Sequence, residues 1–389
     1  MKPIRLFFRF SLITFALLVI IIYVFNLDYL LNGVSKTYLK GYSGPNIYDE
    51  SYFESAAVKG SDNPSDPFLR SEFTKTSLKD TAFHNSIGTD FMFIAYQDTV
   101  LLEYENLNRL SDRSNSFSMA KSMVALCAAK SIELGTIPSW QTPINLYDSA
   151  DAFDATIANQ GIGNFLSMSS GLDWIESGKN PFSDNAKAYY GSDLNQLVIG
   201  KKANTNEIGK YIYKSGNTQI AAMALESANQ NSLADFFNEH FWEKIGCNSA
   251  SWGTDSKNNE KAYCCLYAKG IDYAKIGKLL LNKGVYSGKQ VISPDILSQM
   301  IKPYVKYRMD GELNDCYGIG FWLLKYKGKS LFYARGILGQ YIIMIPEENL
   351  LIVRLGEKRL DTDAKMHPMD IYHYLDNAFE LKSEYEKRY

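Results

Sequence analysis

The sequence predicts an α+β fold in which an antiparallel sheet is flanked by helices and a mostly helical region is inserted between its two parts. Three observations lead to this prediction. Strand patterns occur near both ends of the chain, at 91–105 and 317–355. Between them, the pattern from 126 to 301 is mostly helical. An apolar run at 10–25 precedes all of these segments and predicts one N-terminal transmembrane helix.

The first 34 residues are predicted to be a membrane anchor. Three basic residues precede the run at 10–25, in which only Ser11 and Thr14 are polar, and with 4–8 it approaches the ~20 residues that cross a bilayer. The basic flank predicts a single pass through the cytoplasmic (inner) membrane, with the rest of the chain outside the cytoplasm. The alternative is a cleaved signal peptide, but no convincing small-x-small cleavage site follows the run.

Residues 35–389 are predicted to form one domain. Its sheet part comprises about 35–125 and 302–389, and its helical part about 126–301. Glycine, proline, serine and aspartate interrupt the stretch at 35–85, which we expect to place short helices over the main domain.

Individual elements follow from local patterns. A hairpin is expected where the apolar runs 91–96 and 99–105 flank Gln97-Asp98. The expected helices of the middle region are 162–168, 194–199, 218–229, 233–245, 272–282 and 294–301. The expected later strands are 317–324, 330–333, 340–345 and 350–355, followed by a closing helix at 369–388.

The composition argues against several functions. A formal net charge of -2 gives no electrostatic basis for binding nucleic acid. The four histidines lack the spacing of metal ligands, and no phosphate-binding glycine loop occurs, so neither a metal nor a cofactor is predicted. The five cysteines are too few for a disulfide framework; they leave at least one free thiol and allow one disulfide that the sequence does not place.

The stretch 116–135 is predicted to be a buried helix with serines at its start and Gly135 at its end. Ser118 and Lys121 are three residues apart, so both project from the same side of the first turn. Burial makes the charged form of a lysine costly, and a neutral amine can accept a proton from a neighbouring serine, which then becomes a nucleophile. The alternative is a surface lysine above an ordinary helix start.

Two other segments could complete a site around Ser118. In the polar loop at 211–219, Tyr213 could act as a proton shuttle, although a tyrosine there could equally serve in packing. At 334–340, glycines allow a close approach of substrate to backbone, and an N–H group there could complete an oxyanion hole with the N–H of Ser118. The alternative is a glycine-rich bend. No Gly-x-Ser-x-Gly elbow is present, which argues against an α/β-hydrolase.

With these three pieces in this order, the chain resembles the β-lactamase-related serine hydrolases, the group of class C β-lactamases and penicillin-binding proteins. Within that group it is most similar to the branch of esterases and 6-aminohexanoate-dimer hydrolases. Further matching segments are 165–174, 213–219, 250–255, 272–277 and 317–322. The likeness extends over about 37–360 and implies a β-lactamase/transpeptidase-like fold.

The resemblance also implies a chemistry. Ser118 would be the nucleophile, Lys121 its base partner and Tyr213 the general acid and base. The backbone N–H groups of Ser118 and Ile337 would form the oxyanion hole. An ester or amide would then be cleaved through an acyl-enzyme that water resolves, without a cofactor.

Four residues are implied as substrate contacts. They are Tyr190, Ser215, Gly336 and Trp174. Ser215 stands where the family's Tyr-x-Asn motif has asparagine, as it also does in the dimer-hydrolase branch.

The third family motif departs from the pattern. Ala334 replaces the usual lysine or histidine, so the cation that holds the carboxylate of a β-lactam or peptide is missing from that position. Arg335 could replace it only if its side chain turned into the cleft, which the alternation of side chains along a strand disfavours. We therefore expect an esterase or amidase acting on another acyl group.

The sequence thus predicts a membrane-anchored, periplasmic serine hydrolase whose partners are a small-molecule ester or amide and the membrane. Two alternatives remain open: a cell-wall peptidase or β-lactamase, and a non-catalytic envelope binding protein that has kept the hydrolase fold. The joint presence of Ser118, Lys121 and Tyr213 argues against the second.

Overall fold

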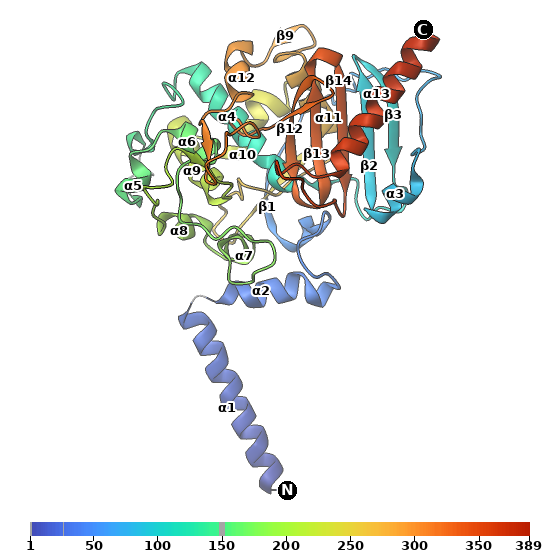
Figure 1. Ribbon diagram of the computed structural model, residues 1–389. Coiled ribbons are helices and arrows are strands. Elements are labelled where there is room, and N and C mark those ends of the chain that lie inside the picture. Colours follow the sequence, from blue (N-terminus) through green and yellow to red (C-terminus); the bar gives the residue numbers. More distant parts are fainter. Residues whose placement is uncertain (1, 26, 148–151) are drawn as a thin grey trace.

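The main feature of the fold is a six-stranded antiparallel sheet, seen in a computed structural model that describes residues 2–25, 27–147 and 152–389, apart from the side chains of 2–9, 18, 21 and 23 (Figure 1). In spatial order its strands are β11 (Trp322–Tyr326), β12 (Lys329–Gly336), β13 (Gln340–Ile345), β14 (Leu350–Gly356), β2 (Thr89–Tyr96) and β3 (Thr99–Glu105). The early strands join the late ones where β2 pairs with β14, with Ile94 opposite Ile352. The prediction of one sheet built from both ends of the chain is confirmed.

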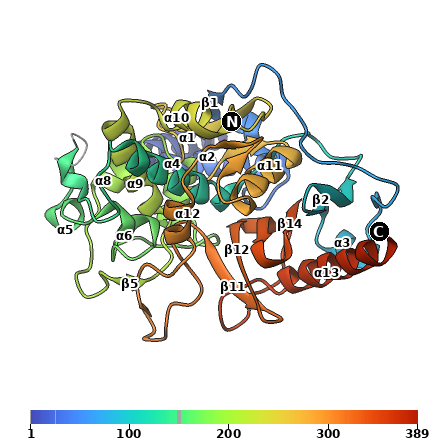
Figure 2. The same ribbon diagram turned by 90° about the horizontal axis from the view of Figure 1, so that it is seen from above.

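Alternation along the strands separates the core into two layers. Phe91 and Phe93 of β2 point into the larger layer, whereas Met92 and Ile94 point into the smaller one. The larger layer contains α11 (Gly270–Leu281) and α4 (Ala120–Leu134), and the smaller one contains α13 (Asp370–Arg388). Seen from above, α11 and α13 lie on opposite faces of the sheet (Figure 2).

Strand β11 begins later than the predicted residue 317. Gly320 has φ +77°, and a Cβ atom built on it would lie 2.3 Å from the Cβ of Ala125 in α4. The Ser122 hydroxyl also donates to the Gly320 carbonyl at 2.6 Å. The segment before Trp322 therefore turns closely against α4 instead of continuing as a strand.

The helical part lies beside this sheet. Its elements are α5 (Ala155–Ala158), α6 (Ile162–Leu166), α7 (Asp184–Tyr190), α8 (Leu194–Ile199), α9 (Gly216–Asn229), α10 (Leu233–Phe237) and α12 (Pro294–Met300). The predicted helix at 233–245 is interrupted, because α10 ends at Phe237 and a π-helical segment, Asn238–Trp242, follows it.

Short strands that the sequence did not predict form further sheets. The largest has the order β1 (Glu54–Val58), β6 (Ala250–Thr254), β7 (Leu266–Ala268) and β4 (Ser114–Asn115). Two-stranded pairs are β5 (Lys210–Tyr211) with β10 (Tyr307–Arg308) and β8 (Val285–Tyr286) with β9 (Lys289–Gln290). Sheet pairing at β4 places the segment before Ser118 beside β7.

Among the described residues, three α-helices precede strand β2. They are α1 (Lys2–Val24), α2 (Asp28–Lys36) and α3 (Thr81–Ser86). Helix α1 projects away from the rest of the chain, whereas the Asn32 side chain of α2 donates to the Tyr190 carbonyl of α7 at 3.0 Å (Figure 1). Among the residues that the structure describes, no helix combines the length and apolar character needed to span a bilayer, so the predicted transmembrane helix is not supported.

The cysteines form one disulfide, between the adjacent residues Cys264 and Cys265. The other three, Cys127, Cys247 and Cys316, are buried free thiols. The bonded pair directly follows Tyr263, whose carbonyl takes part in the site described below.

Two buried histidines make the stability of the fold depend on pH. Nδ1 of His84 lies 2.9 Å from the Thr89 hydroxyl, and Nδ1 of His367 lies 2.8 Å from the Tyr333 hydroxyl. Burial lowers the pKa of each imidazole from 6.5 to about 4. Between pH 4 and pH 6.5 the unfolded chain binds more protons than the folded protein. The stability that the two neutral imidazoles contribute is therefore fully present above pH 6.5 and is lost as the pH falls toward 4.

We expect a His84→Gln variant to lack one such contribution. Glutamine can still bond Thr89 but does not titrate. The free energy of unfolding of the wild type, relative to that of the variant, should therefore decrease as the pH falls from 6.5 to 4.5. Urea unfolding curves across this range measure the difference, and a pH-independent difference would contradict the assignment.

Candidate active site

Ser118 lies on a sharp turn that leads into α4. The residues Phe117–Met119 form a 3-10 turn, so the helix predicted from 116 begins only at Ala120. Phe117 has φ +43°, a left-handed conformation that bulky residues rarely adopt. The Asn115 side chain accepts from the Phe117 N–H at 2.8 Å and holds this turn, which presents Ser118 to a cavity.

Lys121 is buried beside Ser118. Only 2% of its surface is exposed, and its Nζ atom lies 2.8 Å from the Ser118 Oγ atom. Nζ also donates to the Tyr263 carbonyl at 2.9 Å, which fixes the position of the amine. The structure therefore brings the two side chains together in the way their spacing predicts. Such a pair can transfer the hydroxyl proton to a neutral amine.

Tyr213 reaches the same cavity from the loop before α9. Its ring stacks on Trp322 with centroids 5.6 Å apart and meets the edge of Tyr317 at 6.0 Å. The Lys121 Nζ atom lies 5.1 Å from the centroid of the Tyr213 ring. Within the described part of the chain, the Tyr213 hydroxyl has no hydrogen-bond partner, so it remains available to a bound molecule.

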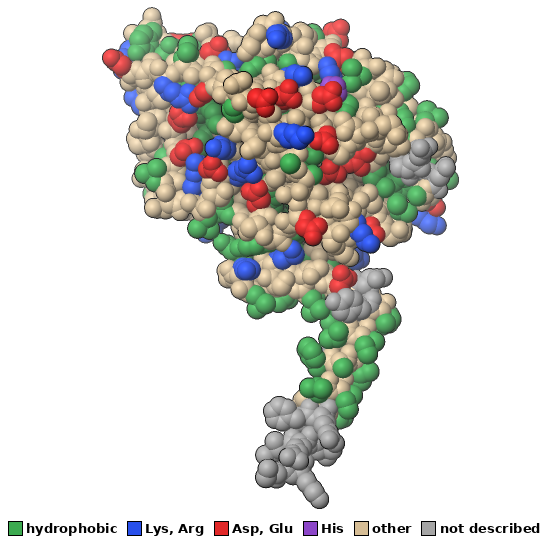
Figure 3. Space-filling view, turned by 180° about the vertical axis from the view of Figure 1, so that it is seen from behind, with side chains coloured by type: hydrophobic (Ala, Val, Ile, Leu, Met, Phe, Trp, Pro, Cys, Tyr) green, Lys and Arg blue, Asp and Glu red, His purple; other side chains and the backbone are tan. Residues whose placement is uncertain are grey.

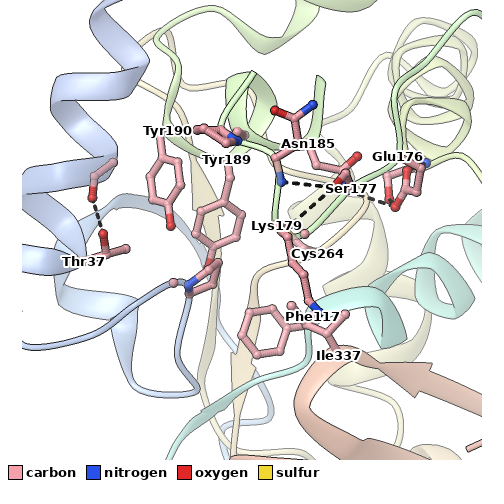
Figure 4. A pocket seen from close by; sticks show the side chains of 18 of the residues that line it. Thr37, Phe117, Glu176, Ser177, Lys179, Asn185, Tyr189, Tyr190, Cys264 and Ile337 are labelled. Atoms are coloured by element: carbon pink, nitrogen blue, oxygen red, sulfur yellow. Dashed lines mark hydrogen bonds between the residues drawn. The ribbon is translucent and has the colours of Figure 1, made fainter. Parts of the chain in front are cut away.

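Gly336 and Ile337 place backbone beside the nucleophile. Strand β12 ends at Gly336, and a Cβ atom there would lie 2.3 Å from the Ser116 carbonyl oxygen. Only glycine permits this approach. Ile337 begins the 3-10 turn Ile337–Gly339, and it and Phe117 lie at the same end of the cavity (Figure 4). Ser118 and Ile337, each near the start of its turn, thus both line the cavity.

The cavity has a volume of about 340 Å³, and Ser215 and Glu176 line one part of it. The backbone N–H and hydroxyl of Ser215 donate to the two carboxylate oxygens of Glu176, at 2.6 and 2.8 Å. The Asn185 amide donates to the same carboxylate at 2.9 Å. Sequence reasoning missed Glu176, because the conformation of its loop depends on these tertiary contacts.

The structure does not bring Trp174, a predicted substrate contact, into the lining of the cavity. Trp174 is only 4% exposed and does not line the cavity. Its indole N–H donates to the Asn185 side chain at 2.8 Å, and a Cβ atom on Gly216 would lie 2.5 Å from its ring. The indole therefore holds the Asn185 side chain by a hydrogen bond and packs closely against Gly216 at the start of α9.

The structure separates the roles of the two adjacent tyrosines. Both tyrosines line the cavity, and Tyr190 is half-buried. Tyr189 is buried, and its hydroxyl donates to Asp49 at 2.6 Å. Burial beside that carboxylate raises the pKa of the Tyr189 hydroxyl well above its usual value. Tyr190 is therefore the better placed of the two for a substrate contact.

Arg335 lies next to the cavity but its guanidinium is already engaged. Its Cζ atom lies 3.4 Å from the Trp322 ring centroid, and the side chain donates to the Met366 carbonyl at 2.6 Å. Ala334 points to the opposite face of β12 and is buried. The place of the usual family cation is thus filled by a methyl group.

Comparison with known proteins identifies the family. The family model described as Beta-lactamase matches residues 108–373, which is more than half of the chain. The chain belongs to the beta-lactamase family. The family is one of serine hydrolases, and among the described residues no group of acidic, histidine or cysteine side chains could hold a metal ion.

Solved structures share the fold of this beta-lactamase family member. One, named "Putative 6-aminohexanoate-dimer hydrolase from Bacillus anthracis", has a TM-score of 0.74 and 18% identity, covering 88% of this chain and 94% of that one. A family VIII carboxylesterase has a TM-score of 0.59 and 15% identity, with coverages of 79% and 98%. A penicillin-binding protein from Bacillus halodurans has a TM-score of 0.56 and 12% identity, with coverages of 81% and 100%. No curated protein matches the chain.

Proposed function

We propose that this member of the beta-lactamase family is an esterase or amidase that acts through an acyl-enzyme on Ser118. The 2.8 Å separation of the Lys121 Nζ and Ser118 Oγ atoms is the observation that best supports it. Lys121 accepts the hydroxyl proton while Oγ attacks the carbonyl carbon of the substrate. The N–H groups of Ser118 and Ile337 stabilise the resulting oxyanion, a type of interaction that contributes about 10²–10³-fold to rate.

Tyr213 completes the proposed proton path. Its hydroxyl gives a proton to the leaving alcohol or amine as the carbonyl bond to that group breaks, and Lys121 returns a proton to the tyrosine. A water molecule then attacks the acyl-enzyme, releases the acid and restores the Ser118 hydroxyl. The aromatic contacts of Tyr213 with Trp322 hold the ring in place for both steps.

An ordinary ester or amide fits this site better than a β-lactam or a cell-wall peptide. The substrate carboxylate of those compounds needs a cation, and Ala334 supplies none. The Arg335 guanidinium is occupied by Trp322 and Met366. A stable adduct of labelled penicillin on Ser118 would instead favour the peptidase or β-lactamase alternative.

We further propose that residues 1–34 anchor the domain to the outer side of the cytoplasmic membrane. The apolar run at 10–25 and the basic residues before it support this. Hydrophobic side chains are exposed along α1 (Figure 3). Phe10, Phe15 and Ile20 are among them. Such a surface is unusual beside water alone.

We expect a fluorophosphonate probe to label Ser118. Trypsin cleaves after Arg113 and Lys121, so mass spectrometry should find the adduct on the peptide 114–121, and fragmentation should assign it to Ser118 rather than Ser114 or Ser116. Absence of labelling, together with no turnover across a broad ester panel, would favour the non-catalytic binding protein.

The same labelled band tests the anchor. In fractionated cells it should stay with the membranes after an alkaline carbonate wash. A labelled band in the soluble fraction would reject the anchor and leave the hydrolase proposal intact.

A further inference from the structure

Helix α2 forms a wall of the active-site cavity. The same space as Ser118 is lined by Leu30, Gly33 and Val34 of this helix and by Thr37, which directly follows it. Thr37 and Tyr190 lie toward one side of the cavity, and Phe117 and Ile337 toward the other (Figure 4). The cavity therefore extends from the nucleophile to a helix that lies outside the segment matched by the family model.

The α2 end of the cavity offers mainly apolar surface. Leu30 and Val34 contribute aliphatic side chains, and Tyr190 contributes its ring. Two of the nearby polar groups have partners, because the Thr37 hydroxyl donates to the Gly33 carbonyl at 2.6 Å and the Asn32 amide donates to the Tyr190 carbonyl at 3.0 Å. The hydroxyl of Tyr29, which also lines the cavity, has no hydrogen-bond partner among the described residues. Apart from the Tyr29 hydroxyl, a polar substrate group placed here would find few partners, whereas an apolar chain would be removed from water.

Gly33 keeps this end of the cavity open. A Cβ atom built on it would lie 3.3 Å from the Cδ2 atom of Tyr190, closer than an unforced contact. A larger side chain at this position would therefore push against the Tyr190 ring and fill the space between α2 and α7. The absence of a side chain at Gly33 both lets α2 pack closely and leaves room for a ligand.

We propose that the α2 end of the cavity binds a linear apolar chain of the substrate, so that the protein prefers esters or amides with such a chain to short ones. This inference rests on the proposed hydrolase function. An apolar chain of several methylene groups would lie along Leu30 and Val34 while its carbonyl is held between the N–H groups of Ser118 and Ile337.

Two ester series test this inference on the full-length protein. The first is p-nitrophenyl acetate, butyrate and octanoate, which lengthen the acyl chain; the second is ethyl, butyl and octyl acetate, which lengthen the alcohol. In one series kcat/KM should rise with length, by up to about fourfold for each methylene that becomes buried. Which series shows the rise identifies the part of the substrate that lies against α2.

Substitutions on α2 should remove this preference. Gly33→Leu should lower the ratio of kcat/KM for the octyl or octanoyl ester over the shortest ester by about tenfold, because leucine occupies the space of several methylenes. Val34→Asp should lower the same ratio, because it places a charge in the lining of the apolar end. Val34 is partly exposed, so this variant should fold even if Gly33→Leu does not. Ser35→Leu places the same side chain on the exposed side of α2, away from the cavity, and should leave the ratio unchanged.

The outcomes separate the two proposals. Equal kcat/KM across both series would overturn the apolar subsite. So would a ratio of kcat/KM, longest over shortest ester, that falls as much in Ser35→Leu as in Gly33→Leu. In either case, hydrolysis of short esters would still support the hydrolase proposal. A wild-type protein that hydrolyses no ester and takes no fluorophosphonate label would overturn the hydrolase itself.

Discussion

Ser118→Ala is expected to lower kcat/KM for an ester by about 10⁴-fold or more, because no other group can form the acyl-enzyme. The substitution removes only the hydroxyl group, and the backbone N–H of residue 118 remains. What activity is left should come from binding and from that N–H group alone.

The fold should survive this substitution. Lys121 is the hydrogen-bond partner of the Ser118 hydroxyl, and after its loss the amine still donates to the Tyr263 carbonyl. We expect the thermal unfolding temperature of Ser118→Ala to stay close to that of the wild type. Steady-state hydrolysis of the preferred ester, with a burst measurement on the wild type, checks the prediction. A variant that is folded and retains a substantial part of the wild-type rate would show that Ser118 is not the nucleophile.

The six-stranded sheet could be predicted because its strands carry strong local patterns. Strands β2, β13 and β14 are mostly apolar and are bounded by turn residues, a pattern typical of strands that are buried on both faces. The small sheet of β1 and β6 could not be predicted in the same way. These strands have five residues each and pair across almost 200 positions of sequence, with Ser55 opposite Gly253. Their conformation depends on that distant partner.

The same contrast between local patterns and contacts of distant segments applies to the candidate site. The approach of Lys121 to Ser118 follows from their spacing on one helical turn, which is a local property. The left-handed Phe117, the carboxylate of Glu176 and the wall made by α2 depend on packing between distant segments. The resemblance to a family located Tyr213 and Ile337, which spacing alone could not have joined to Ser118.

Lys121→Met is expected to lower kcat/KM by about 10³–10⁴-fold, near the upper range for loss of a general base. Methionine has a similar unbranched shape and fills the same buried space, so the change removes the amine with little change in volume. Without the amine, the Ser118 hydroxyl keeps its proton at neutral pH and attacks a carbonyl slowly. The rate of fluorophosphonate labelling should fall together with the rate of hydrolysis, since both require the activated oxygen.

Two effects on stability oppose each other in Lys121→Met. Loss of a buried amine removes a desolvation cost, whereas the Tyr263 carbonyl loses its donor, at a cost of about 1–3 kcal/mol. We therefore expect a folded protein with a free energy of unfolding within about 3 kcal/mol of the wild type. Lys261→Met is the matched control, because Lys261 is equally buried but donates to the Tyr189 carbonyl and does not contact Ser118.

A second comparison shows whether Lys121 acts through Ser118. The double variant Ser118→Ala/Lys121→Met should be no slower than Ser118→Ala, because residues that act as one unit are not additive in their effects on rate. Independent losses that multiply in the double variant would mean that the amine acts on the substrate by another route. The 2.8 Å contact between the two side chains would then be structural, and the general base would have to be Tyr213 alone.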